Sequence, residues 1–328
     1  MILAGDIGGT NARLAYFQPQ NGHLQLVSEK VFRSREHREF GEIVARFVDE
    51  SGARPEAACF GIAGPVRNGR VETSNLPWVI EQSLLAKQIQ LPATLLINDL
   101  EANAWGIGAL GPGDLVALNH VTAPAVGNQA VIAPGTGLGE AGLYWDGTRH
   151  HVFACEGGHT DFAPQDDLQI ELLRFLRTRF GHISYERILS GPGLVNVYEF
   201  LRQTEGGKES GTTAVAIDAG DAAAAISRAA FNGTDALAEK ALELWVAVYG
   251  AEASNLALKL MATGGLFLGG GVTPKILPKL TGPLFMDAFL AKGRLRPLIE
   301  SIPVQVVMND KAGLLGAARC AAARATES

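Results

Sequence analysis

The chain has 328 residues, 47% of them hydrophobic, and carries a formal net charge of −6 at pH 7. This length can bury one large core or two medium-sized cores, and two domains are the better expectation. The acidic balance, without a dense Lys/Arg cluster, argues against nucleic-acid binding, and no apolar run approaches the ~20 residues needed to span a bilayer. The three cysteines form no CxxC pair and no secretory signal precedes the first strand, so we expect a cytoplasmic protein.

The chain begins with two apolar runs joined by a glycine turn, ILAGDIGGTNARLAY over residues 2–16. This pattern predicts a β-hairpin whose tip carries few side chains. Such a tip lets backbone N–H groups approach an anion closely, and the carboxylate of Asp6 beside it can hold a divalent metal. An ordinary glycine-rich hairpin would look the same if the motif occurred only once.

The next elements alternate between strand and helix, which is typical of α/β proteins. Phe40, Ile43 and Phe47 recur at helical spacing, and Gly52 follows as a stop signal. In chain order we expect a strand over 27–33, a helix over 40–51, strands over 57–63 and 94–97, and a helix from about 100 to the glycines near 106–113. That Gly/Pro cluster is the best domain boundary in the first half.

Asn98 and Asp99 follow directly after a buried strand, where α/β folds place ligands. Asn98 could instead be a helix N-cap, with Glu101 completing a capping box. That alternative leaves Asp99 unexplained. A carboxylate on the first helical turn suits a general base for a hydroxyl group.

A second hairpin of the same kind is predicted over VIAPGTGLGEAGLYW, residues 131–145. Its glycines match GxGxxG by letter, but a strand entering an Asp146-Gly147 turn follows instead of the helix that a dinucleotide-binding fold needs. No GxxxxGK[ST] motif occurs either. Two phosphate-type hairpins about half a chain apart suggest one nucleotide held by two similar domains.

The second half then becomes mostly helical. We expect helices over 165–180 and 239–262, an exposed polar loop over 203–213, a strand, triple-glycine turn and helix start over 266–274, a strand over 304–308 and a helix over 311–325.

Three further constellations in this half carry chemistry, and each has an ordinary structural alternative. His159 follows Glu156 in a glycine-rich turn, Glu186 lies on a short helix, and Gly269, Gly270 and Gly271 leave room for a flat base against the backbone. A lone histidine is more often structural, Glu186 could be a solvated helix residue, and the triple glycine could be a simple turn.

Together these motifs resemble the bacterial glucokinase family, within the hexokinase–actin–Hsp70 superfamily. The resemblance spans essentially the whole chain and rests on their order and spacing: GDIGGTNARLA, INDLEANAWG, APGTGLGEAGL, EGGHTDFAP, ISYERILSGPGLVNVY, FLGGGVTPK and NDKAGLLGAA. It implies an α/β two-domain actin-like ATPase (ribonuclease H-like) fold with an interdomain cleft. The expected domains are 1–110 plus 304–328, and 111–303.

The resemblance also implies a role for each matched position. Asp99 is expected to be the catalytic base, and the sugar hydroxyls are expected to be bound by Asn98, Asp99, Glu156, His159 and Glu186. Mg²⁺ is expected near Asp6. The ATP contacts are expected at Gly5, Asp6, Ile7, Gly8, Gly9, Thr10, Gly135, Thr136, Gly137, Gly139, Gly269, Gly270 and Gly271.

The function expected from this resemblance is ATP-dependent phosphorylation of D-glucose to glucose 6-phosphate by a homodimeric enzyme. A kinase for fructose, mannose or an N-acetylhexosamine remains an alternative, as does a non-catalytic sugar or nucleotide sensor. The cysteine-rich zinc motif of kinase–repressor relatives is missing, so no structural zinc is expected. The first hairpin begins at residue 2, which leaves no room before it for a DNA-binding helix-turn-helix.

Overall fold

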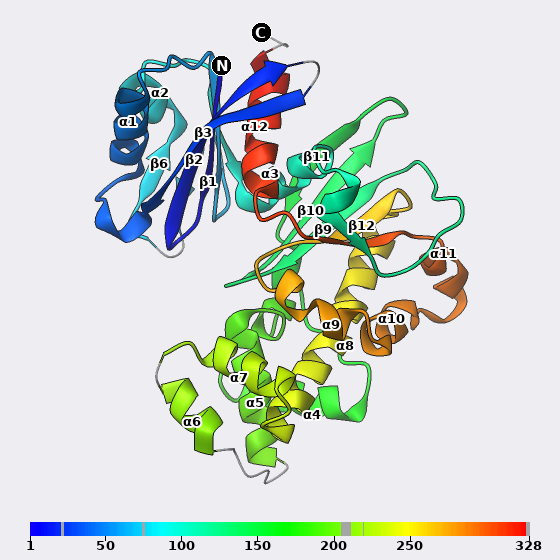
Figure 1. Cartoon of the computed structure of the whole chain (residues 1–328). Helices are drawn as coiled ribbons and strands as arrows, with labels where there is room; N and C mark the ends of the chain where they lie inside the picture. Colours follow the sequence, from blue (N-terminus) through cyan, green and yellow to red (C-terminus); the bar gives the residue numbers. More distant parts are fainter. Residues whose placement is uncertain (21–22, 74–75, 205–210, 219, 326–328) are drawn as a thin grey trace. The chain divides into compact units, whose positions relative to one another are not determined.

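The computed structural model describes residues 1–20, 23–73, 76–204, 211–218 and 220–325 (Figure 1). The chain divides into two compact units. Unit 1 comprises Met1–Leu115, Val152–Ala154 and Asn309–Ser328, and unit 2 comprises Val116–His151 and Cys155–Met308. The described helices include none that is long and apolar enough to cross a membrane.

Unit 1 is built on a mixed sheet with the strand order β3-β2-β1-β4-β7. The bounds are Ile2–Ile7 for β1, Asn11–Gln20 for β2, His23–Arg33 for β3, Ala57–Ile62 for β4 and Thr94–Asn98 for β7. β1 pairs antiparallel with β2 and parallel with β4, and β4 pairs parallel with β7. β5 (Arg70–Glu72) and β6 (Val79–Glu81) form a separate small hairpin.

Helices cover both faces of this sheet, so β1 and β4 are buried on both sides. Leu3 and Ile7 join one core cluster with Phe47 of α1, whereas Ile2 and Ala4 join another with α12. The helices of unit 1 are α1 (Phe40–Ser51), α2 (Gln82–Gln88), α3 (Asp99–Ile107) and α12 (Ala312–Ala325), with the short 3₁₀ helices η1 (Ser34–Glu36) and η2 (Pro112–Asp114). The alternation along β1 puts Asp6 on the α12 side.

α12 packs on α3 through glycines, and the two helices lie side by side in Figure 1. A Cβ atom on Gly316 would collide with the carbonyl oxygen of Ala102, and one on Gly106 with that of Ala312. We therefore expect Gly316→Ala to force the helices apart and to lower the free energy of unfolding by ~1–3 kcal/mol, as overpacked cores do. Urea unfolding measures this, with Gly113→Ala as the control because a Cβ there meets open space. Equal stability of the two variants would contradict the close approach.

Unit 2 is built on a sheet with the strand order β11-β10-β9-β12-β13-β8. The bounds are Leu115–Ala117 for β8, Gln129–Pro134 for β9, Leu138–Trp145 for β10, His150–Cys155 for β11, Gly265–Leu268 for β12 and Val304–Val307 for β13. β9 and β10 form the second predicted hairpin, and β12 pairs in parallel with both β9 and β13.

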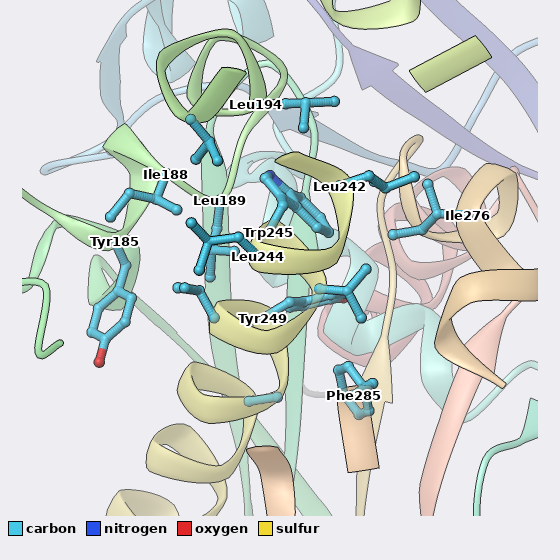
Figure 2. Packing of buried hydrophobic residues seen from close by; sticks show 14 of the residues in the cluster. Tyr185, Ile188, Leu189, Leu194, Leu242, Leu244, Trp245, Tyr249, Ile276 and Phe285 are labelled. Carbon is cyan, nitrogen blue, oxygen red and sulfur yellow. The ribbon is translucent and has the colours of Figure 1, made fainter. Parts of the chain in front are cut away.

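The long helix α8 (Ala236–Leu260) supplies much of the core of unit 2. Figure 2 shows Trp245 and Tyr249 of this helix packed among side chains from other elements, including Leu189 and Phe285. The other helices are α4 (Asp167–Arg177), α5 (Gly191–Thr204), α6 (Gly211–Asp218), α7 (Ala222–Phe231), α9 (Leu277–Leu280), α10 (Pro283–Leu290) and α11 (Arg296–Glu300). The 3₁₀ helices are η3 (Gly157–His159), η4 (Tyr185–Arg187), η5 (Thr273–Ile276) and η6 (Gly293–Leu295).

Most elements lie within a few residues of their predicted bounds. α1 ends before Gly52, whose φ of 62° is the left-handed conformation of a helix C-cap. The predicted loop over 203–213 is wrong at both ends, because α5 continues to Thr204 and α6 begins at Gly211, and its middle lies outside the described residues. The helix start after the triple glycine is a 3₁₀ helix, η5, with Pro274 in its first turn.

Candidate active site

The first hairpin has a tip organised by backbone hydrogen bonds. The N–H of Gly8 donates to the carbonyl oxygen of Asn11 at 2.9 Å. The buried residue Ser34 secures the tip, since its Oγ donates to the carbonyl of Gly8 at 2.9 Å and its N–H to that of Thr10 at 3.0 Å. The tip therefore has the fixed shape that an anion-binding turn requires, and sequence reasoning missed Ser34.

Different constraints explain the glycines of the predicted tip. Gly8 has room for a side chain, whereas a Cβ on Gly5 would lie 2.6 Å from the Phe60 ring and 2.8 Å from Leu14. Gly5 and Ile7 both belong to β1. The packing of the sheet therefore accounts for Gly5. The turn itself is formed by Gly8, Gly9 and Thr10.

Asp6 lies on β1, two residues before the tip residue Gly8. Burial raises its pKa, against the lowering effect of Arg13, which is itself paired with Asp310 at 3.2 Å. A Cβ on Gly313, in the first turn of α12, would lie 3.5 Å from the Asp6 carboxylate, so the absence of a side chain there keeps space in front of Asp6.

A site for Mg²⁺ at Asp6 fits these residues. Mg²⁺ usually keeps several waters and binds one or two carboxylates together with phosphate oxygens, and carboxylate oxygen is its preferred protein donor. Among the described residues no group of three or more His, Cys, Asp or Glu side chains could hold a metal. Any magnesium held here would consequently depend on Asp6 with waters and nucleotide oxygens.

Asn98 and Asp99 lie where β7 ends and α3 begins. The Oδ1 atom of Asn98 accepts from the N–H groups of Leu100 at 2.8 Å and Glu101 at 3.3 Å, and its Nδ2 donates to the carbonyl of Gly64 at 3.1 Å. Asn98 is therefore the N-cap of α3, as the structural alternative predicted, and it stabilises the start of this helix in addition to any role in binding.

Asp99 is the first residue of α3, at the carboxyl end of a parallel strand. Its Oδ1 accepts from the N–H of Leu100 at 2.9 Å. Asn103, one helical turn later, donates to the carbonyl of Asp99 at 2.9 Å and was not singled out by sequence reasoning. The capped first turn thus fixes the backbone that carries the carboxylate.

Unit 2 brings Glu186 against the second hairpin. The N–H of Leu138 donates to Glu186 Oε2 at 2.9 Å, and a Cβ on Gly137 would collide with this carboxylate. Gly135 is held separately, because its carbonyl accepts from the N–H of Gly191 at 2.9 Å. The alternative of a freely solvated Glu186 is wrong.

Glu156, His159 and Glu186 gather at one place in unit 2. His159 lies with Nε2 at 4.0 Å from Glu156 Oε2 and with Nδ1 at 4.0 Å from Glu186 Oε1. The side chains of Glu156 and His159 are 59% and 57% exposed, so their polar atoms can reach a ligand. Two carboxylates around an imidazole make a suitable set of acceptors and donors for neighbouring hydroxyl groups.

A cavity of about 1010 Å³ opens beside the second hairpin within unit 2. Its wall includes Gly135 and Thr136 of the hairpin, Gly271 of the triple glycine and a stretch of α7. Its apolar lining includes four side chains that Figure 2 shows within the core cluster: Leu194, Leu242, Trp245 and Ile276. Polar groups at its edge include Ser190, Asp221, Asn232 and Lys275. An apolar cavity with a few polar groups is the usual form of a small-molecule site.

The triple glycine has one position that demands glycine. Gly270 has φ of 81°, and a Cβ there would lie 2.5 Å from the carbonyl oxygen of Pro134. Gly271 meets open space, and Gly269 ordinary contacts. The close approach of Gly270 to the end of β9 brings this turn next to the second hairpin. The contribution of α7 to the cavity was not anticipated, because its alanine-rich sequence carries no motif.

The sequence profile of the glucokinase family matches residues 3–324. The glucokinase of Nostoc sp. is 40% identical over 98% of this chain and 99% of its own length. The chain belongs to the glucokinase family. A solved glucokinase from an Antarctic psychrotroph is 30% identical, covers 98% of both chains and superimposes with a TM-score of 0.85.

A more distant solved structure shares the fold. It is a glucokinase of the ROK family from Streptomyces griseus, in complex with glucose and AMPPNP, with 24% identity, 98% of this chain covered, 99% of its own, and a TM-score of 0.64. The glucokinase-family chain described here has the actin-like two-domain α/β fold, as expected.

Proposed function

We propose that this member of the glucokinase family transfers the γ-phosphoryl group of ATP to the 6-hydroxyl of D-glucose, with Asp99 as the general base. Glucokinase activity is the function of the family that the chain matches from residue 3 to residue 324. The observation that carries the assignment of the site is the gathering of Glu156, His159 and Glu186 beside the second hairpin.

The sugar hydroxyls are bound by Asn98, Asp99, Glu156, His159 and Glu186. Neighbouring hydroxyls each offer one donor and two acceptor positions, which carboxylates and an imidazole can satisfy in fixed directions. Asn98 retains donor capacity for this role, because Nδ2 carries a second hydrogen beyond the one given to Gly64. A site that uses its polar groups in this way discriminates against analogues that leave one of them unpaired.

The ATP phosphates are bound by the two hairpin tips, Gly8 to Thr10 and Gly135 to Gly137, and the adenosine occupies the cavity beside Gly269 to Gly271. Each tip is a glycine-rich turn, and backbone N–H groups that such a turn does not use internally suit anions. Asp6 would hold Mg²⁺, which supplies charge neutralisation for the nucleotide phosphates when it is bound.

In phosphoryl transfer the protein mainly positions the reactants and stabilises the charge of the transition state. Asp99 accepts the proton of the 6-hydroxyl as that oxygen attacks the γ-phosphorus in line, and the bond from the γ-phosphorus to the bridging oxygen breaks to release ADP. The capped first turn of α3 holds the carboxylate in place during this step. Backbone N–H groups of the hairpins take up the charge that develops on the phosphoryl oxygens.

A coupled assay of ADP release tests the substrate assignment. We expect turnover with Mg-ATP to be dominated by glucose in a panel that also contains fructose, mannose, galactose and N-acetylglucosamine. Preference for another hexose would overturn the glucose specificity while leaving the base in place. No turnover with any sugar, in protein that still binds ATP, would favour the non-catalytic sensor. Homodimer formation stays a prediction from the resemblance, and a cytoplasmic location stays a prediction from the cysteine pattern.

A further inference from the structure

Unit 2 contains a pair of buried carboxyl groups that the proposed reaction does not use. Glu140 on β10 is 1% exposed and Glu252 on α8 is fully buried, and a side-chain hydrogen bond joins the two carboxyl groups. Two ionised carboxylates have only acceptor atoms, so such a bond requires a proton on one of them. The pair therefore contains one shared proton.

The surrounding groups decide which carboxyl carries the proton. Glu252 accepts from Asn255 Nδ2 at 2.8 Å and lies 3.4 Å from Lys259 Nζ, whereas Glu140 Oε1 has no hydrogen-bond partner among the described residues. Glu140 therefore lacks the nearby donor and cation that would stabilise it as an ionised carboxylate, and we take it as the group that carries the proton. Burial, followed by the charge of Glu252, raises the pKa of Glu140 to about 8.

The same pair supports two segments of the candidate sugar site. A Cβ on Gly157 would collide with the Glu140 carboxyl, so the backbone between Glu156 and His159 rests directly on this group. On the other side, Glu252 and Asn255 contact the hydroxyl of Tyr185, with Asn255 Nδ2 donating at 2.9 Å. Tyr185 immediately precedes Glu186 in η4.

We propose that Glu140 and Glu252 act as positioning residues. Through one shared proton they hold η3 and η4 in fixed positions relative to each other, so that glucose affinity depends on that proton. The proposal rests on the proposed function, because it takes Glu156, His159 and Glu186 as the sugar-binding groups.

Loss of the proton is expected to push the two carboxylates apart. Two carboxylates in contact in a buried site repel each other strongly, and burial shields this pair from solvent that would screen the repulsion. The Glu140 side chain has no free space toward Gly157. Separation of the two groups therefore displaces η3, η4 or both, and with them the side chains that bind the sugar.

The other polar or titratable groups that act on this pair come from several elements. They are Lys259 and Tyr249 of α8, Cys155 at the end of β11, Tyr185 of η4 and Lys292, which donates to Asn255 Oδ1 at 2.6 Å. Burial raises the pKa values of Tyr249, Cys155 and Tyr185 and lowers that of Lys292. The raised values keep the two tyrosines and the cysteine un-ionised between pH 6 and 8, where Glu140 begins to lose its proton.

The test compares wild type with Glu140→Gln from pH 6 to 9, measuring kcat and the glucose KM at saturating Mg-ATP. The glutamine amide donates to Glu252 as the protonated acid does, but it cannot lose that hydrogen. We expect the two proteins to have similar glucose KM at pH 6.5. Above pH 8, the wild-type KM should rise by up to about tenfold per pH unit relative to that of the variant, with little difference in kcat.

The matched control is Glu171→Gln, the same change at an exposed position on α4, which should reproduce the wild-type pH profile. Parallel KM profiles for wild type and Glu140→Gln would overturn the proposal. A raised glucose KM for Glu140→Gln already at pH 6.5 would also overturn it, because the shared hydrogen would then not be what holds the site.

Thermal unfolding separates failure of this proposal from failure of the proposed function. Because the pKa of folded Glu140 is raised above its unfolded value, the stability that its proton contributes is present at low pH and is lost as pH rises through about 8. The Tm of Glu140→Gln minus that of wild type should consequently increase from pH 5 to 8, with or without sugar kinase activity. A constant difference would exclude the shared proton. Absence of glucose turnover together with an increasing difference would instead exclude the proposed function.

Discussion

Asp99→Asn is expected to lower kcat by ~10²–10⁴-fold while glucose still binds, because an amide cannot accept the proton of the 6-hydroxyl. The substituted side chain keeps an oxygen in the place of Oδ1, which accepts from the N–H of Leu100 at 2.9 Å. The first turn of α3 should therefore keep its shape. Steady-state kinetics give kcat, and isothermal titration with glucose gives the affinity.

The control for this variant is Asp49→Asn, the same change at an exposed position of α1 in unit 1. It should have wild-type kinetics. Near-normal turnover by Asp99→Asn would remove the base from the mechanism. If both glucose binding and turnover were lost, the carboxylate would be needed to hold the sugar. The kinetic effect could then not be assigned to proton transfer.

The local parts of this fold follow from the sequence because their causes are local. α1 was predicted with its observed bounds, since its apolar spacing and Gly52 specify a helix and its end. The cap by Asn98 is similarly decided within three residues. The two hairpins follow from apolar runs on either side of glycine turns, although contacts from distant residues such as Ser34 and Glu186 help to fix their tips.

The clustering of Glu156, His159 and Glu186 depends on contacts that no spacing reveals. Glu186 reaches the site because it accepts from the N–H of Leu138, 48 positions earlier in the chain. The pairing of Glu140 with Glu252 is likewise invisible in the sequence, because an isolated glutamate in a strand resembles a solvated one. The prediction of a loop at the start of α6 was wrong. Glycine and threonine have poor helix propensity, but these residues are nevertheless helical in the structure.

Gly137→Ala is expected to raise the glucose KM by ~10–100-fold, because the new Cβ displaces the Glu186 carboxylate from the N–H of Leu138. A hydrogen bond to a charged group contributes ~1.5–3 kcal/mol, which corresponds to this range. The displacement also moves Glu186 relative to His159, whose Nδ1 lies 4.0 Å away. The measurement is the glucose KM at saturating Mg-ATP.

Gly135→Ala makes the same change two residues earlier on the same hairpin, where a Cβ meets open space. If that space belongs to the nucleotide phosphates, this variant should raise the KM for Mg-ATP and leave the glucose KM unchanged. Opposite effects of the two variants would place the phosphate on one side of the hairpin and the sugar on the other. If both variants raised only the KM for Mg-ATP, Glu186 would have no role in sugar binding, and its contact with Leu138 would serve only to shape the hairpin.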